Sequence, residues 1–189
     1  MMRGTFAIVG MLALLAAGLT GCQQPNMDEM MKPPARPAEL DQLNVFVGTW
    51  EGTYEMTMPG VDKPKTGKGL DTFAWDADKW VLAERMDGTM DGHKMFGTGL
   101  WSWDAQHKRF AYYSADSYGM TMTGTGSYDA EKQIWHMKGC TRDTLHGHQS
   151  VGEGTVKFVD NNTMEMTWSE WDSLHLCKFM EMKGTCHRK

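Results

Sequence analysis

The chain has 189 residues, enough for one domain with a substantial hydrophobic core. Lysine and arginine total 19 against 24 aspartates and glutamates, a net charge of −5 that argues against a nucleic-acid partner, because nucleic-acid binding requires a basic face. Aromatic residues make up 11% of the chain, too much large apolar surface for a disordered protein. We therefore expect a folded domain that does not bind nucleic acid.

The N-terminal segment "MMRGTFAIVGMLALLAAGLTGC" has the pattern of an export signal. It begins with the positive charge of Arg3, continues with an apolar run too short for a transmembrane helix, and ends on small residues before a cysteine. Its ending, Leu19-Thr20-Gly21-Cys22, resembles the bacterial lipoprotein signal, which implies cleavage before Cys22 and a lipid on its sulfur. The alternative is an ordinary signal peptide followed by a cysteine that carries no lipid. By the same resemblance, Gln23 in place of aspartate implies an anchor in the outer membrane, facing the periplasm.

The mature chain is predicted to start with a tether. Residues 22–39 are polar and contain four of the six prolines, which favours a semi-extended linker between the signal peptide (1–21) and a domain at 40–189. The segment "AELDQLNVFVG" that follows offers a short helix with Leu40, Leu43 and Phe46 on one side. Three cysteines remain in the domain, an odd number whose pairing stays open, and no Cys-x-x-Cys occurs: Cys140, Cys177 and Cys186.

From residue 48 the pattern becomes that of β-strands. In "GTWEGTYEMTM" the apolar side chains alternate with polar ones, which predicts a half-buried strand over 48–58. Gly-x-Gly then recurs at 67–69, 97–99, 124–126 and 152–154, each followed by an aspartate-type turn such as "WDADKW" or "YDAEKQIW". We interpret each repeat as strand, tight turn, strand and a glycine-bearing return.

Four such hairpins, the strand at 48–58 and a last strand at 174–183 give about ten strands. The predicted fold class is therefore all-β, an antiparallel up-and-down barrel with a short N-terminal helix, because closure removes unpaired edges. A two-sheet sandwich is the alternative. The chain also resembles the bacterial lipocalin-like (calycin-type) family of unknown function, through Val47-Gly48-Thr49-Trp50, the "G-x-G…YDA" repeat and the final Met180–Lys189 strand. That resemblance implies a barrel with a ligand cavity and supplies no activity.

Catalytic signatures are missing from the sequence. It contains no Gly-x-Ser-x-Gly elbow, no His-Glu-x-x-His and no phosphate-binding glycine loop before a helix. Glu84, Asp87 and Glu170 are scattered carboxylates that define no acid/base pair. We expect no catalytic residues and no cofactor.

Metal and haem binding are minor alternatives. Met-x-Met pairs, as at Met120/Met122, suit Cu(I), although core filling explains them as well. His146 and His148 with His175 could bind zinc from one rim of the barrel. The opening Gly-x-Trp-x-Gly at residues 48–52 is similar to that of nitrobindin-type barrels, which ligate haem through a late histidine. His175 is the late candidate in the predicted last strand, although its neighbours Leu174 and Leu176 have the more inward pattern.

The strongest functional signal is the inward face of the strands. Alternation places fifteen methionine and aromatic side chains there, which we predict to line a lumen: Trp50, Tyr54, Met56, Phe73, Trp75, Met120, Met122, Tyr128, Trp135, Met137, Met164, Met166, Trp168, Met180 and Met182. A lumen of this kind would bind a small hydrophobic molecule. The same face could instead form a filled core, as in a structural or interaction module of the cell envelope.

Overall fold

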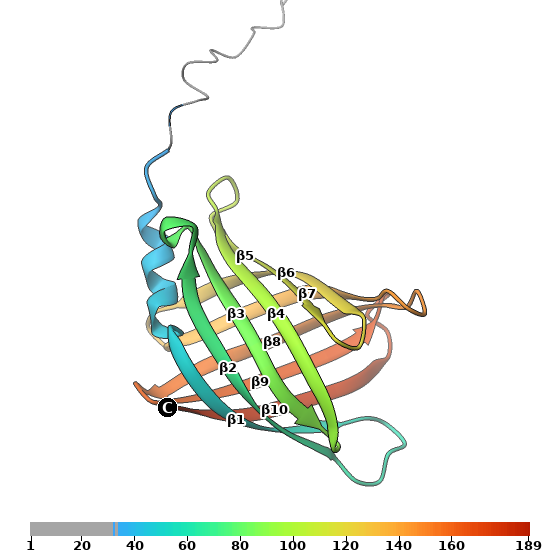
Figure 1. Cartoon of the computed structure of the whole chain (residues 1–189). Helices are drawn as coiled ribbons and strands as arrows, with labels where there is room; N and C mark the ends of the chain where they lie inside the picture. The colour runs from blue at the N-terminus through green and yellow to red at the C-terminus, as the bar shows by residue number, and fades with distance from the viewer. Residues whose placement is uncertain (1–31, 33) are drawn as a thin grey trace, which may run out of the picture. The chain divides into compact units, whose positions relative to one another are not determined.

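A computed structural model describes residue 32 and residues 34–189 (Figure 1). The elements in chain order are η1 (Ala38–Val45), β1 (Gly48–Thr57), β2 (Lys65–Asp76), η2 (Ala77–Lys79), β3 (Val81–Met90), β4 (His93–Asp104), β5 (Arg109–Asp116), β6 (Met120–Asp129), β7 (Ile134–Asp143), β8 (Gln149–Asp160), β9 (Thr163–Asp172) and β10 (Lys178–Arg188). The predicted signal peptide, Cys22 and most of the predicted tether lie outside the described residues. Within the described part, no helix is long and apolar enough to cross a membrane.

The ten strands form a closed antiparallel barrel. Each strand pairs with its neighbours in the chain, and β1 also pairs with β10. Trp50, for example, lies opposite Asp71 of β2 on one side and opposite Arg188 of β10 on the other. The up-and-down barrel is thereby confirmed and the sandwich alternative is wrong, since a sandwich would leave strand edges unpaired.

Alternation and aspartate turns build the hairpins as predicted. In β1, Trp50 and Gly52 are buried while Glu51 and Thr53 are exposed. The four predicted turns join β2 to β3, β4 to β5, β6 to β7 and β8 to β9, all at the end of the barrel that carries η1. At Asp129, for instance, the carboxylate accepts hydrogen bonds of 3.1 Å from two backbone N–H groups of its own turn.

The Gly-x-Gly pairs lie inside strands β2, β4, β6 and β8 and not in the connections between strands. Their inward positions leave room for large side chains of the adjacent wall. A Cβ on Gly152 would lie 2.4 Å from the indole ring of Trp168, and one on Gly99 would lie 2.7 Å from a carboxylate oxygen of Glu84. These glycines therefore permit bulky side chains to lie flat against the inner wall.

The last strand begins later than predicted, at Lys178 rather than at residue 174. The carboxylate of Asp172 accepts hydrogen bonds from the backbone N–H groups of Leu174, Leu176 and Cys177, so the chain turns there. His175 sits in this turn with a φ of 59° and is exposed. Both leucines are 74% exposed, so the prediction of an inward face at these positions is wrong.

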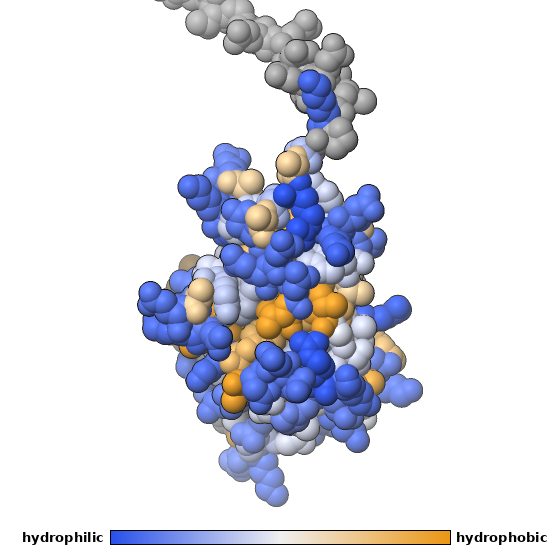
Figure 2. All heavy atoms as spheres, turned by 90° about the vertical axis from the view of Figure 1, so that its left-hand side faces the viewer, coloured by the Kyte–Doolittle hydropathy of each residue, from blue (hydrophilic) through white to orange (hydrophobic). Residues whose placement is uncertain are grey.

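Helix η1 plugs one end of the barrel. Leu40 and Leu43 are fully buried, and the ring of Phe46 lies 5.2 Å from that of Trp135 and 5.1 Å from that of Phe158. Figure 2 shows this end of the molecule with a small apolar area surrounded by hydrophilic side chains. The hydrophobic core is thus concentrated at the η1 end.

Arg188 fastens the plug to the last strand. Its guanidinium donates hydrogen bonds to the carbonyl oxygens of Val45, at 2.9 Å, and Val47, and lies 4.2 Å from the centre of the Trp50 ring. The Trp50 indole N–H in turn donates to the Phe46 carbonyl oxygen at 2.7 Å. These contacts satisfy the carbonyl groups at the end of η1, which have no partner within the helix.

We predict that Gly154→Ala destabilises the barrel. A Cβ at this position would lie 2.0 Å from the backbone oxygen of Thr167, which has little freedom to move. Overpacking of this kind lowers the free energy of unfolding by about 1–3 kcal/mol. Urea denaturation should show that loss, while Lys157→Ala, an exposed change on the same strand, should leave stability within about 0.5 kcal/mol. Equal stability of Gly154→Ala and the wild type would contradict the close approach.

Candidate functional site

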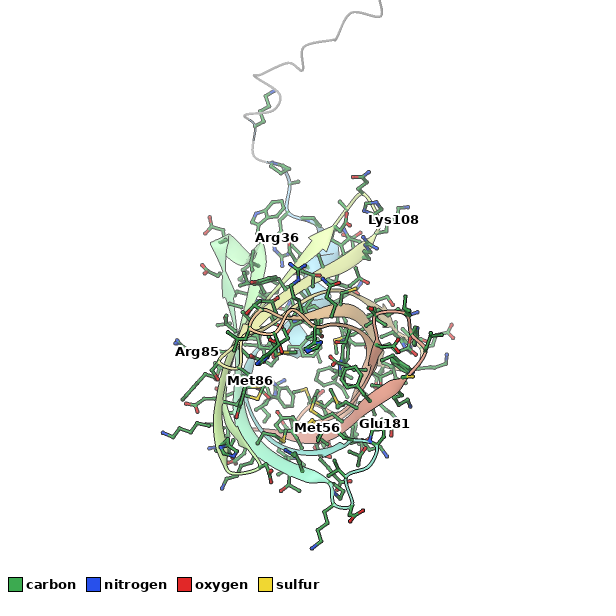
Figure 3. All side chains as sticks on the ribbon, turned by 90° about the vertical axis from the view of Figure 1, so that its right-hand side faces the viewer. Arg36, Met56, Arg85, Met86, Lys108 and Glu181 are labelled. Atoms are coloured by element: carbon green, nitrogen blue, oxygen red, sulfur yellow. The ribbon has the colours of Figure 1, made fainter. Side chains whose placement is uncertain are left out.

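The end of the barrel opposite η1 contains a cavity of about 730 Å³. Eleven of the twelve methionines in residues 36–189 line it, and Met58 is the exception. The eleven are Met56, Met86, Met90, Met95, Met120, Met122, Met137, Met164, Met166, Met180 and Met182. Figure 3 looks toward this end and shows Met56 and Met86 inside the ring of strands, while Arg85 points outward. The interior is thus hollow, and methionine is the residue type that lines it most often.

Eleven of the fifteen side chains predicted for the lumen line this cavity: Tyr54, Met56, Phe73, Met120, Met122, Met137, Met164, Met166, Trp168, Met180 and Met182. The other four point inward but belong to the η1 end. Trp50 and Trp135 are fully buried in the core, and Trp75 and Tyr128 pack against it. Alternation along a strand indicates whether a side chain points inward, but not its position along the barrel axis. In this barrel, that position decides whether an inward side chain lies in the core or lines the cavity.

Polar inward residues were missed by the sequence reasoning. Asp71, Glu84, Tyr112 and Glu170 all line the cavity. Each stands two positions from a buried apolar residue on the same strand, as Glu84 does from Leu82. An even spacing from a buried residue could therefore have identified these inward polar side chains. Asp87 stands an odd number of positions from Leu82 and is exposed, as the alternation of a strand requires.

Asp71 and Tyr54 form a polar contact inside the cavity. The Tyr54 hydroxyl donates a hydrogen bond to Oδ2 of Asp71 and lies 3.5 Å from Sγ of Cys186. Asp71 is 6% exposed, and its other oxygen, Oδ1, is buried without a hydrogen-bond partner among the described residues. Burial raises the pKa of the Asp71 carboxyl, and it also raises the pKa of the Cys186 thiol to about 11.

Glu84 lies beside this pair. Its strand neighbour across the sheet is Phe73, two residues from Asp71, so both carboxyl groups project into the cavity from adjacent strands. Oε2 of Glu84 accepts a hydrogen bond from the Tyr112 hydroxyl at 3.4 Å. Burial, followed by the charge of Asp71, raises the pKa of Glu84 to about 7.

Glu170 forms a separate, well-satisfied cluster nearer the open ends of β7, β8 and β9. Its carboxylate accepts hydrogen bonds from Thr141 at 2.9 Å, from Ser150 at 3.2 Å and from the indole N–H of Trp168 at 3.0 Å. Three donors compensate the burial of this carboxylate, which is 7% exposed. Glu170 therefore has the contacts of a structural group.

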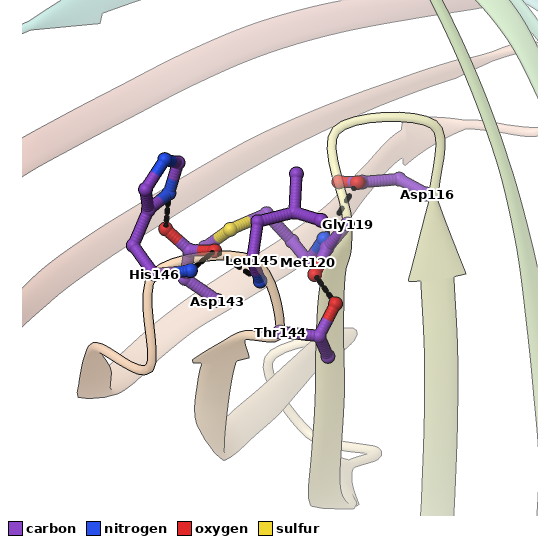
Figure 4. Close-up of polar contacts among 7 residues, drawn as sticks. All are labelled: Asp116, Gly119, Met120, Asp143, Thr144, Leu145 and His146. Carbon is purple, nitrogen blue, oxygen red and sulfur yellow. Dashed lines mark hydrogen bonds and ion pairs between the residues drawn. The ribbon is translucent and has the colours of Figure 1, made fainter.

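Two rim loops at the open end are joined by hydrogen bonds (Figure 4). The Gly119 carbonyl oxygen accepts from the backbone N–H of Thr144 at 2.9 Å and from its hydroxyl at 2.7 Å. Leu145 covers Gly119, whose hypothetical Cβ would lie 2.8 Å from the leucine Cγ. Leu145 is nevertheless 71% exposed, so the rim presents apolar side chains to solvent beside the cavity.

The structure does not assemble the histidines suggested for zinc. Nδ1 of His146 pairs with the Asp143 carboxylate at 2.7 Å, and the His175 ring packs on Trp171 at a centroid distance of 4.4 Å. Among the residues that the structure describes, no group of three or more His, Cys, Asp and Glu side chains is placed to hold a metal ion. His175 also lies in an exposed turn rather than in the strand assumed for a haem ligand.

The fold and the cavity define a class, the closed antiparallel barrel with a hollow interior. Residues 36–185 match the family described as "Protein of unknown function (DUF1579)", and the chain belongs to that family. The barrel is similar to the crystal structure of Rv2717c from M. tuberculosis, with a TM-score of 0.65, 14% identity and coverage of 81% of this chain and 98% of that one. It is also similar to the S-type phycobiliprotein lyase CPES from Guillardia theta, with a TM-score of 0.55, 10% identity and coverage of 83% and 98%. No curated protein matches the chain.

The raised pKa of Glu84 predicts a pH-dependent stability. Because its pKa rises from 4.5 to about 7 on folding, its protonated form favours the folded state below pH 4.5, and this contribution is lost as pH rises toward 7. Glu84→Gln should therefore match the wild type near pH 4.5 and exceed its free energy of unfolding by about 3 kcal/mol at pH 8.

Urea denaturation at both pH values measures this difference. Glu55→Gln, an exposed change on β1, is the matched control and should show the same difference at both pH values. A pH-independent difference for Glu84→Gln would contradict a carboxyl group held in the apolar cavity.

Proposed function

We propose that this protein binds a small, mostly apolar molecule inside the barrel. The observation that carries the proposal is the cavity of about 730 Å³ with its eleven methionines. Ligand sites of small molecules have volumes of roughly 300–1,000 Å³ and predominantly apolar walls. The similarity to the two solved barrels concerns the fold alone, so the proposal depends on the cavity itself.

Methionine suits such a site because its side chain is long, unbranched and polarizable. It adapts to irregular apolar shapes and makes favourable sulfur contacts with aromatic rings. Met122, Met137 and Met166 come from three different strands and reach the same space. Burial of apolar ligand surface against them contributes roughly 25 cal/mol per Å².

A filled structural core, the main alternative from sequence, accounts less well for this interior. A close-packed core leaves few voids larger than a water molecule. Copper(I) bound by thioethers remains a second candidate, because the methionine pairs of several strands reach one space. A single ion with a few ligands would nevertheless fill little of about 730 Å³, whereas an apolar molecule would occupy it.

We predict that the purified barrel binds an environment-sensitive apolar dye and that Met122→Trp weakens this binding at least tenfold. The larger ring would occupy cavity volume beside Gly139, whose hypothetical Cβ lies 3.2 Å from the Met122 side chain. Fluorescence titration measures the dissociation constant, and Cu(I) titration against a chelator tests the second candidate.

Met58→Trp is the matched control, since Met58 is the one methionine of the domain outside the cavity lining. It should bind the dye as the wild type does. Failure of the wild type to bind any apolar dye, or equal binding by both variants, would count against a lumenal site.

We further propose that the protein is anchored to the outer membrane by a lipid on Cys22 and faces the periplasm. The support is the sequence Leu19-Thr20-Gly21-Cys22 after an apolar run. Cys22→Ala should move the protein from the membrane fraction to the soluble fraction of the cell envelope, while Cys140→Ala should leave it membrane-bound. Unchanged membrane fractionation of Cys22→Ala would refute the anchor.

A further inference from the structure

Two neighbouring carboxyl groups stand in an otherwise apolar part of the cavity. Asp71 is 6% exposed and Glu84 is half-buried, and both line the space between the methionines and the aromatic core. An ionised carboxylate in such surroundings is unfavourable by several kcal/mol unless a cation or several hydrogen-bond donors compensate it. While ionised, the pair therefore requires such compensation.

Lys65, Lys68 and His93 line the same cavity, but none of them forms an ion pair with either carboxyl group. Within residue 32 and residues 34–189, no lysine, arginine or histidine forms an ion pair with Asp71 or Glu84. Arg188 donates its hydrogen bonds to backbone carbonyl oxygens, and Lys65 forms an ion pair with Asp91 at 3.5 Å. Oδ1 of Asp71 stays buried without a hydrogen-bond partner in this region.

Glu170 provides an internal comparison. Glu170 is as buried as Asp71, but three donors of the protein surround its carboxylate. Asp71 accepts from a single hydroxyl, that of Tyr54, while Glu84 accepts from the Tyr112 hydroxyl and has the Trp101 indole as a second donor. The difference separates a structural carboxylate from two that retain acceptor capacity toward the cavity.

We propose that the ligand is an amphipathic cation, with a protonated amine or amidine head between Asp71 and Glu84 and an apolar body against the methionines. This inference rests on the proposed function and specifies its ligand class. The head would supply the charge and the N–H donors that the two carboxylates lack, and hydrogen bonds to charged partners are the stronger kind. An anionic head would be repelled by the same pair.

The pair also makes binding depend on pH. Glu84 faces Asp71 from β2 and Tyr112 from β5, and its pKa is raised to about 7. Tyr54 from β1 contacts both Asp71 and Cys186 of β10, and so completes the titratable groups around the pair. A cationic head prefers the ionised form, so binding should release a proton near neutral pH. Affinity for an amine should rise about tenfold between pH 6 and pH 8, whereas affinity for a neutral ligand should stay constant.

Three ligands of twelve carbon atoms each test the inference: dodecylamine, dodecanol and dodecanoate, each below its aggregation concentration. Displacement of the bound dye at pH 8 measures their dissociation constants. We expect dodecylamine to bind at least tenfold more tightly than dodecanol, and dodecanoate to bind more weakly than either. The amine alone should gain affinity between pH 6 and pH 8.

Asp71→Asn combined with Glu84→Gln should abolish the preference for the amine over dodecanol. Both amides still accept the tyrosine hydrogen bonds, and Glu55→Gln on the outer face of β1 should change nothing. If the double variant does not fold, the comparison of the three ligands on the wild-type protein still tests the inference. Equal binding of all three ligands, or preference for dodecanoate, would overturn the cationic head while keeping the apolar site. Failure of all three to bind would refute both the site and the head.

Discussion

The ring of Phe46 lies against aromatic rings from four strands and closes one end of the barrel. Closure of β1 onto β10 removes the strand edges but produces a tube, and ten strands enclose more volume than their own side chains readily fill. Helix η1 supplies the missing apolar volume through Leu40, Leu43 and Phe46, and it does so at one end only. The cavity begins where this plug stops, so its depth depends on the packing of one short helix.

Glycine and methionine together shape the rest of the interior. A Cβ on Gly97 would lie 3.0 Å from the terminal methyl group of Met86, and one on Gly139 would lie 3.2 Å from Met122. The glycines therefore let methionine side chains fold back against the wall instead of crossing the lumen. Since methionine has three rotatable bonds, this wall can adjust to apolar molecules of different shape. Such a wall would bind apolar ligands without selecting strictly for their shape.

Sequence patterns predicted the barrel because its main determinants are local. Alternation over each strand and the aspartate turns, such as that at Asp129, depend on residues that are close in the chain. What could not be predicted depends on the third dimension. Trp50 and Met56 share one face of β1, yet the first is buried beneath η1 and the second lines the cavity. Likewise, the last strand begins later than predicted because three backbone N–H groups donate to the Asp172 carboxylate and form a turn there. The hydrophobicity of the sequence does not reveal this turn.

The carboxyl groups of Asp71 and Glu84 are the least expected residues from the standpoint of stability. Apolar residues of similar size at these positions would pack the interior without the penalty of burying charge, and such replacements are commonly neutral or stabilising. The penalty is greatest at neutral and alkaline pH, where Glu84 ionises. A ligand that binds only the folded barrel and carries a compensating charge would offset it by mass action. On the proposed cationic ligand, stability and ligand recognition would be linked through the same two groups, and this link would account for unfavourable side chains in the lumen.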